Sequence, residues 1–228
     1  MGSKSLVFLI VPLFLAPACT SISVYQTAKT LPKGNTQAGL GLGVGKFNNK
    51  AKLVDFDADI AAISGDIWLR RGLTDKVDAG LKLSIPGSIT TDLRLGLLNE
   101  DKGDRFSVAT GLGFIYTNGS SETGNRKDKT KIWDVLIPLY LSKDLGKTTT
   151  VYFVPRYVQR STKNTRETAG QTTEEKFSDP MIGLGGGMMF NLGNKRDKHI
   201  AFEYNRVFDP NEANHYNSQG GVGLSFEF

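Results

Sequence analysis

The chain ends in Gly220-Gly221-Val222-Gly223-Leu224-Ser225-Phe226-Glu227-Phe228, a stretch that alternates between two kinds of side chain. Apolar residues take every second position from Val222 to Phe228, and glycine, serine or glutamate takes the positions between them. Because successive side chains of a β-strand point to opposite faces, this stretch predicts a strand with one apolar face and one small or polar face.

This tail resembles the closing strand of bacterial outer-membrane β-barrels, in which the terminal phenylalanine is the signal for assembly. The resemblance implies that Phe226 and Phe228 form such a signal and that the barrel-assembly machinery is a partner. The stretch from Arg71 to Gly80 (Arg-Gly-Leu-Thr-Asp-Lys-Val-Asp-Ala-Gly) also resembles a hairpin turn of uncharacterised outer-membrane barrels, in which Asp75 suits an Asx-type turn. By its pattern the resemblance covers residues 36–228, but it is specific only at this hairpin and at the tail.

The same two-faced alternation recurs upstream of the tail. It predicts nine further strands, over residues 37–47, 60–72, 76–85, 88–98, 105–116, 132–144, 149–160, 179–192 and 198–208. Pro138 and Pro155 fall inside two of them, and each predicts a β-bulge because proline cannot donate to the ladder.

The connections between these strands alternate in length. Short turns are expected near residues 73–75, 99–104, 145–147 and 193–197, and mostly longer loops over 48–59, 117–131, 161–178 and 209–218. Short periplasmic turns and longer outer loops are typical of outer-membrane barrels. We therefore predict an all-β, antiparallel up-and-down transmembrane barrel of about ten strands, with both termini in the periplasm.

A soluble barrel or sandwich is the alternative architecture. There the apolar face would point inward and the glycine-rich face outward, where the row Gly39, Gly41, Gly43 and Gly45 would weaken a strand without compensation. The mean hydropathy of −0.24 does not indicate membrane helices. It does not argue against a transmembrane barrel, whose inward polar residues dilute its apolar ones.

The N-terminus has the pattern of a secretory signal peptide. Lys4 precedes an apolar run over residues 6–15, and Ala16-Pro17-Ala18 supplies small residues for cleavage. The single cysteine, Cys19, follows in a sequence that resembles an imperfect lipobox, so we predict a diacylated Cys19 that anchors the chain in membrane lipid. Ordinary cleavage beside an incidental cysteine is the alternative. The predicted organisation is a signal peptide over 1–18, a lipidated tether over 19–35 and a barrel over 36–228.

Charged residues take many of the inward positions, with mixed signs. They are Asp66, Arg70, Asp78, Lys82, Asp92, Arg94, Asp134, Arg156, Arg160, Glu203 and Glu227. A barrel of about ten strands is narrow enough to be filled by side chains, and buried charges must pair or stay hydrated. We expect an ion-pair network that fills the lumen, with a narrow path for small polar solutes or ions as the alternative.

An enzymatic reading has less support. Omptin proteases are ten-stranded barrels with Asp-x-Asp and Asp-x-His pairs at the extracellular rim, and this chain contains Asp55, Asp57 and Asp59 and the pair Asp197 and His199. The predicted topology puts these two groups at opposite ends of the barrel, which leaves only His215 as a general base at the outer rim. We predict no catalytic residues, no cofactor and no metal, because the aspartate triplet lacks the glycine and the closing glutamate of a calcium loop.

The net charge of +5 does not indicate nucleic-acid binding, because no interleaved aromatic and basic surface accompanies it. Basic loops suit the anionic headgroups of outer-membrane lipid instead. The sequence thus predicts a non-enzymatic barrel of the bacterial outer membrane, with a structural, envelope-assembly or surface-interaction role. An envelope or extracellular protein is an expected partner.

Overall fold

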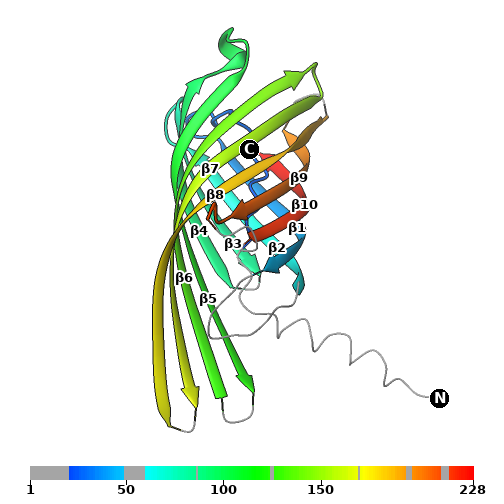
Figure 1. Cartoon of the computed structure of the whole chain (residues 1–228). Coiled ribbons are helices and arrows are strands. Elements are labelled where there is room, and N and C mark those ends of the chain that lie inside the picture. Colours follow the sequence, from blue (N-terminus) through cyan, green and yellow to red (C-terminus); the bar gives the residue numbers. More distant parts are fainter. Residues whose placement is uncertain are drawn as a thin grey trace, which may run out of the picture.

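The computed structural model describes residues 21–48, 60–85, 87–123, 126–168, 170–193, 197–211 and 216–228. Ten antiparallel strands form one closed barrel in which each strand pairs with the next along the chain and β10 closes onto β1 (Figure 1). The predicted up-and-down barrel is confirmed. The strands are β1 (Thr36–Asn48), β2 (Ile60–Gly72), β3 (Val77–Ile85), β4 (Ser88–Leu98), β5 (Ser107–Thr123), β6 (Arg126–Leu145), β7 (Thr149–Thr168), β8 (Gln171–Leu192), β9 (Lys198–Phe208) and β10 (Tyr216–Glu227).

The apolar face of the strands is the outer face of the barrel. In β10, Val222, Leu224 and Phe226 are 37–49% exposed, whereas Gly223 and Ser225 between them are buried. In β4, Leu93 is 51% exposed and its neighbour Arg94 only 3%. This arrangement excludes the soluble alternative, because a water-soluble barrel would turn these apolar side chains inward. No helix within the described residues is long and apolar enough to span a membrane.

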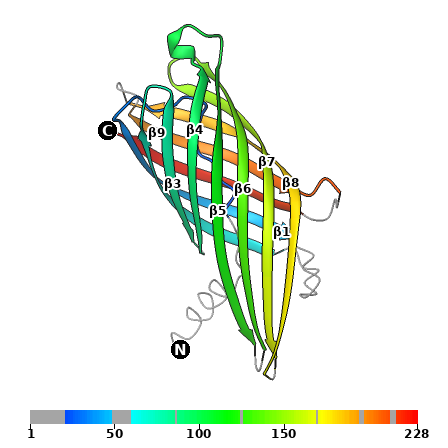
Figure 2. The same cartoon turned by 90° about the vertical axis from the view of Figure 1, so that its left-hand side faces the viewer.

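The two ends of the barrel differ. The connections β2–β3, β4–β5, β6–β7 and β8–β9 lie at one end, where β1 also begins and β10 ends; we call it the short-turn end. A 3-10 turn, η2 (Glu100–Lys102), lies in the β4–β5 connection. At the other end β5 to β8, which are 17 to 22 residues long, extend past the remaining strands as a curved sheet (Figures 1 and 2). We call this the projecting end.

The long loops predicted over 117–131 and 161–178 were wrong. The β6–β7 ladder continues without interruption from Pro138↔Arg156 out to Arg126↔Thr168, and the β7–β8 ladder continues to Thr168↔Gln171. Threonines, which favour extended backbone, are frequent in this part of the chain. Ion pairs also join neighbouring strands, with Lys129 Nζ 3.0 Å from Glu167 Oε1 and Lys163 Nζ 2.7 Å from Glu174 Oε1. These segments are regular strands that are poor in apolar residues, because most of the described side chains on both of their faces are at least partly exposed.

The bulges predicted at Pro138 and Pro155 were also wrong. Pairing lapses beside Pro138, between Pro138↔Arg156 and Leu141↔Phe153, but neither strand gains a residue. Pro155 pairs regularly with Leu184. Among the described pairings the register shifts only in β4, between Gly96 and Leu98. Each proline lacks an N–H group and so omits one ladder hydrogen bond, but the register of the neighbouring strands does not change.

A charged side chain at the middle of the outer face tests this orientation. Leu93→Arg places a guanidinium at the centre of β4, and we expect it to cost about 2–4 kcal/mol of folding free energy in lipid vesicles. Thr172→Arg, on the outer face of the projecting sheet, is the matched control and should cost close to nothing. Urea titrations in phosphatidylcholine vesicles measure both. Equal costs for the two variants would contradict a lipid-facing surface at Leu93.

Candidate functional site

The lumen of the barrel contains the chain's own N-terminal residues. Ser21, Ile22, Tyr25, Ala28 and Leu31 are 1–6% exposed, and their contacts reach strands around the whole barrel. We call residues 21–32 the lumenal segment (blue in Figure 1). The tether predicted over 19–35 thus lies inside the barrel over these residues, a placement that the sequence did not predict. The physical reason is space, because the glycine-rich inner faces of β1 and β10 leave room for a strand of peptide.

Acidic and neutral side chains of the wall bind the main-chain N–H groups of the lumenal segment. Glu203 accepts hydrogen bonds from the amides of Val24 at 2.7 Å and Tyr25 at 2.6 Å. Asp78 accepts from the amide of Leu31 at 2.9 Å. Two neutral groups act in the same way, Gln219 Oε1 for the Ile22 amide (2.8 Å) and Ser142 Oγ for the Ala28 amide (3.1 Å).

Basic side chains of the wall bind its main-chain carbonyls. Lys82 Nζ donates to the Ser23 carbonyl at 2.6 Å, and Arg156 Nη2 donates to the Ile22 carbonyl at 2.9 Å. Arg94 Nη1 donates to the Thr27 carbonyl. The wall thus supplies charged partners to both polar groups of an extended peptide, and such charge-assisted bonds are stronger than neutral ones.

The remaining lumenal charges pair with one another. Arg70 binds Asp78 and Asp92, and Arg94 Nη2 lies 2.6 Å from Asp78 Oδ2. Arg160 forms a two-pronged pair with Asp134 at 2.8 and 2.7 Å.

Apart from the Arg160–Asp134 pair, most of the wall charges predicted from the sequence fall into two groups. Asp78, Asp92, Arg70 and Arg94 form ion pairs among themselves. Lys82, Arg156 and Glu203 have no oppositely charged group within ion-pair distance among the described residues. These three bind the lumenal segment or neutral neighbours instead. Asp66 accepts hydrogen bonds from the Ser21 and Ser23 hydroxyls, and Glu227 lies at the short-turn rim, where it accepts from Asn35 Nδ2 at 2.9 Å.

The ring of Tyr25 lies against Trp68, in a space that glycines of β1 and β10 leave open. Its ring stacks on Trp68 with centroids 5.2 Å apart and planes 20° from parallel, and its hydroxyl donates to the Leu42 carbonyl at 3.1 Å. A Cβ on Gly221 would lie 2.2 Å from the Tyr25 hydroxyl, and one on Gly41 would lie 2.5 Å from the ring. The alternate glycines of β1 and β10 thus provide the space that Tyr25 and Trp68 fill.

Tyr25 also has an unusual backbone. Its φ is +49°, the only positive φ of a non-glycine residue within the described part of the chain. This left-handed conformation costs about 1–2 kcal/mol for an L-residue, so the contacts around Tyr25 must outweigh that cost. This segment has no periodic pattern that could have predicted its place in the lumen, and the one available clue was an aromatic residue just upstream of a strand whose inner face is rich in glycine.

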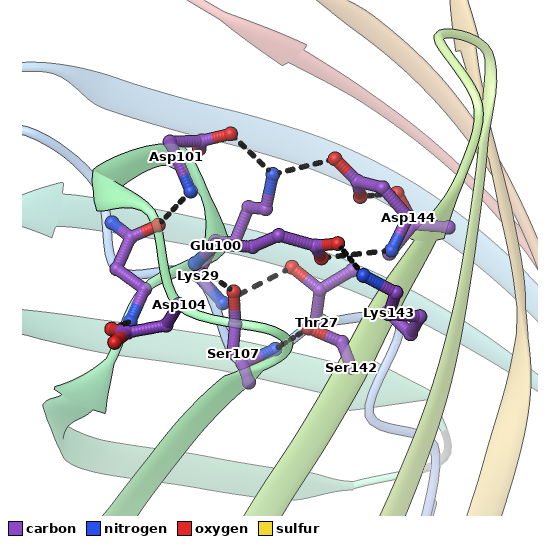
Figure 3. Close-up of polar contacts among 12 residues, drawn as sticks. Thr27, Lys29, Glu100, Asp101, Asp104, Ser107, Ser142, Lys143 and Asp144 are labelled. Atoms are coloured by element: carbon purple, nitrogen blue, oxygen red, sulfur yellow. Dashed lines mark hydrogen bonds and ion pairs between the residues drawn. The ribbon is translucent and has the colours of Figure 1, made fainter.

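At the short-turn end a second set of contacts holds the lumenal segment (Figure 3). Lys29 Nζ lies 2.8 Å from Asp101 Oδ1 in η2 and 2.8 Å from Asp144 Oδ2 in β6. Partial burial by itself would lower the pKa of Lys29, but the two carboxylates outweigh this effect and raise it above its usual value. The ammonium therefore stays charged at neutral pH and joins the segment to two wall elements.

The segment does not fill the lumen completely. A cavity of about 80 Å³ remains beside Ile22 and Ser23 against β2 to β7, large enough for a few water molecules. A larger hollow of about 420 Å³ lies around Thr27 to Pro32 at the short-turn end.

Other candidate residues from the sequence have no assembled site. His199 and Asp197 lie at the short-turn end, where His199 Nδ1 is 2.8 Å from Asn191 Oδ1. Cys19, Asp55, Asp57, Asp59 and His215 lie outside the described residues. Within the part of the chain that is described, no group of three or more histidine, cysteine, aspartate or glutamate residues is placed to hold a metal ion.

A closed barrel with an apolar outer face and an occupied polar lumen defines a transmembrane β-barrel protein. Solved structures share this fold. The outer membrane protease OmpT of Escherichia coli is 14% identical, with a TM-score of 0.52 over 89% of this chain and 100% of OmpT. The translocator domain of the autotransporter NalP of Neisseria meningitidis is 10% identical, with a TM-score of 0.52 over 87% of this chain and 90% of that domain.

The attachment invasion locus protein Ail of Yersinia pestis aligns at 12% identity and a TM-score of 0.42, over 86% of this chain and 99% of Ail. No protein-family model matches the sequence, and no curated protein matches it. At these identities the likeness concerns the fold, which is that of bacterial outer-membrane barrels.

Removal of the Tyr25 ring should loosen the lumenal segment. Tyr25→Ala deletes a stacked, fully buried aromatic side chain, a change that costs about 3–5 kcal/mol in protein cores. We expect trypsin to cleave after Lys29 much faster in this variant than in the native barrel. Tyr157→Ala, which removes an exposed tyrosine from the outer face of β7, is the matched control and should leave cleavage unchanged. Rapid cleavage after Lys29 in the native barrel would contradict the buried placement.

Proposed function

We propose that this protein is a non-enzymatic outer-membrane barrel whose lumen is closed by its own N-terminal segment, with a structural or surface-interaction role. One observation carries the proposal: residues 21–31 lie inside the barrel, where charged side chains of several strands bind their main chain. A barrel occupied in this way suits a scaffold that displays an outer surface better than it suits a conduit.

The asymmetry of the barrel supports an orientation in the membrane. Short turns are typical of the periplasmic side of outer-membrane barrels, which would put the start of β1 and the end of β10 there. Aromatic side chains at the base of the projecting sheet, such as the contacting Tyr116 and Trp133, suit the outer membrane interface. Beyond them Lys131, Lys163 and Lys176 stand directly opposite one another on β6, β7 and β8 and would meet anionic headgroups of outer-membrane lipid.

In this orientation the projecting sheet is the surface for an envelope or extracellular protein partner. Its outward positions carry lysine, glutamate, threonine and serine, so a partner would bind it chiefly through polar contacts. At the opposite end, Phe226 and Phe228 point outward and are 49% and 74% exposed, which leaves them accessible to the assembly machinery.

Lipidation of Cys19 conflicts with a seated lumenal segment. Ser21 binds Asp66, which lies six residues from the end of β2 at Gly72, roughly 20 Å along the strand. The two Cα–Cα steps from Ser21 to Cys19 span at most about 7 Å. A diacyl anchor in the leaflet around the short-turn end therefore requires the segment to leave the lumen.

The two other functions have less support. A solute channel would have to pass the lumenal segment. A rim hydrolase would need Asp55, Asp57, Asp59 and His215, which lie outside the described residues, and the likeness to OmpT extends only to the fold.

Planar-bilayer recording tests the closure of the lumen. We expect the mature barrel to be silent, and a variant with residues 21–31 deleted to give stepwise currents because the lumen becomes water-filled. Stepwise currents through the unmodified barrel would contradict the proposal.

Metabolic labelling with palmitate tests whether a lipid anchor on Cys19 is compatible with a lumenal segment seated in the barrel. In detergent extracts we expect trypsin to cleave the palmitate-labelled fraction after Lys29 and to spare the unlabelled fraction. Cys19→Ala should give a uniformly resistant population. A labelled fraction that resists trypsin as well as the Cys19→Ala variant does would show that anchor and seated segment coexist.

A further inference from the structure

The wall of the lumen binds the lumenal segment mainly through its main chain. Between Ile22 and Leu31, wall side chains accept from five amides and donate to three carbonyls, and none of these bonds depends on which side chain the segment carries. Contacts of this kind suit any peptide that follows the same extended path.

The segment has no place in the β-sheet. Residues 21–31 form no strand, and no main-chain hydrogen bond from them to a strand backbone occurs among the described residues. The segment is therefore held as a ligand is held, by side chains of a preformed wall, and no ladder has to break for it to leave.

A few contacts do select side chains. Asp66 accepts hydrogen bonds from the hydroxyls of Ser21 and Ser23, two positions apart. Between them Ile22 packs with Val158, Met181 and Val207. Two positions after Ser23, the ring of Tyr25 stacks on Trp68. The site thus favours the pattern hydroxyl, apolar, hydroxyl, any residue, aromatic.

An emptied lumen would take hydrogen-bond partners from three wall charges, although Glu203 would keep Tyr152 and Asn205 and Arg156 would keep Asn205. Lys82 and Arg156 each lose a carbonyl acceptor, and Glu203 loses two amide donors. With the segment in place Glu203 and Arg156 are 7% exposed, and once it leaves, water must replace the hydrogen bonds that it made to them. Because charges that lose partners in a narrow lumen are costly, the binding of another peptide to the vacated wall would be favourable.

We propose that the lumen is an exchangeable binding site for an extended polypeptide segment of this pattern, which a separate chain can occupy when the lumenal segment is absent or withdrawn. The inference rests on the proposed function to the extent that it uses the same lumen. It adds that the contents of the lumen are a replaceable ligand, whose main chain is bound by Glu203, Lys82 and Arg156 and whose aromatic residue is bound by Trp68.

A synthetic peptide tests the proposal directly. The barrel lacking residues 21–31 is refolded in detergent and titrated with a fluorescein-labelled peptide of the sequence of residues 21–33, and anisotropy is recorded. We expect saturable binding to this barrel and none to the intact barrel, whose site is filled. N-methylation of the amide that corresponds to Tyr25 removes one donor to Glu203 and should weaken binding about tenfold or more.

Matched variants separate the main-chain and aromatic contributions. Alanine in place of Tyr25 in the peptide should weaken binding to a similar or greater extent, and Glu203→Gln in the barrel should do so without a change in heat-modifiable mobility. Glu174→Gln, on the outer face of the projecting sheet, is the control and should have no effect. A scrambled peptide that binds as well as the native one, or the absence of saturable binding, would overturn the proposal.

A second design covers the case in which the deleted barrel fails to fold. A protease site inserted between Lys33 and Gly34 of the full chain is cut after folding, and exchange of the released segment for labelled peptide is followed. No exchange over days, with the segment retained, would also overturn the proposal. The proposal that the segment closes the lumen fails in a different measurement, if the intact barrel conducts current. The failure of one proposal can therefore be told from the failure of the other.

Discussion

The structure depends on charged side chains of the barrel wall that bind a main chain lying inside the barrel. Glu203, Asp78, Lys82, Arg94 and Arg156 face the lumen from four strands, and each has a hydrogen bond to the segment between Ile22 and Leu31. Buried charges need partners, and a peptide backbone offers donors and acceptors at regular intervals. The wall and the segment thus satisfy each other, and neither is complete alone.

The outer face of the barrel explains why the charges must lie inside. Leu93, Phe114 and Val222 point away from the barrel, so their neighbours along each strand necessarily point inward. Charged residues on the inner faces of β2, β3, β4, β6, β7 and β9 meet the glycine-rich inner faces of β1 and β10. The bare strands provide the space, and Tyr25 and Trp68 fill it with stacked rings.

The barrel could be predicted from the sequence because its signal is a period of two that recurs in every strand. The inward side of Asp66, Arg70 and Arg94 followed from the same period. The length of β5 to β8 could not be predicted, because threonine-rich strands that are solvated on both faces lack the apolar half of that period. The lumenal segment was missed for a related reason. Its partners, such as Asp66 and Gln219, are 45 and 198 residues away from Ser21, and no local pattern marks contacts of that range.

Amide hydrogen exchange in lipid vesicles tests the central claim most directly. The amides of Val24 and Tyr25, which Glu203 binds, should exchange as slowly as those in the middle of β1, and they should exchange much faster when glutamine replaces Glu203. Exchange of these two amides at the rate of an unstructured peptide in the native barrel would show that the segment does not occupy the lumen, and the account would be wrong.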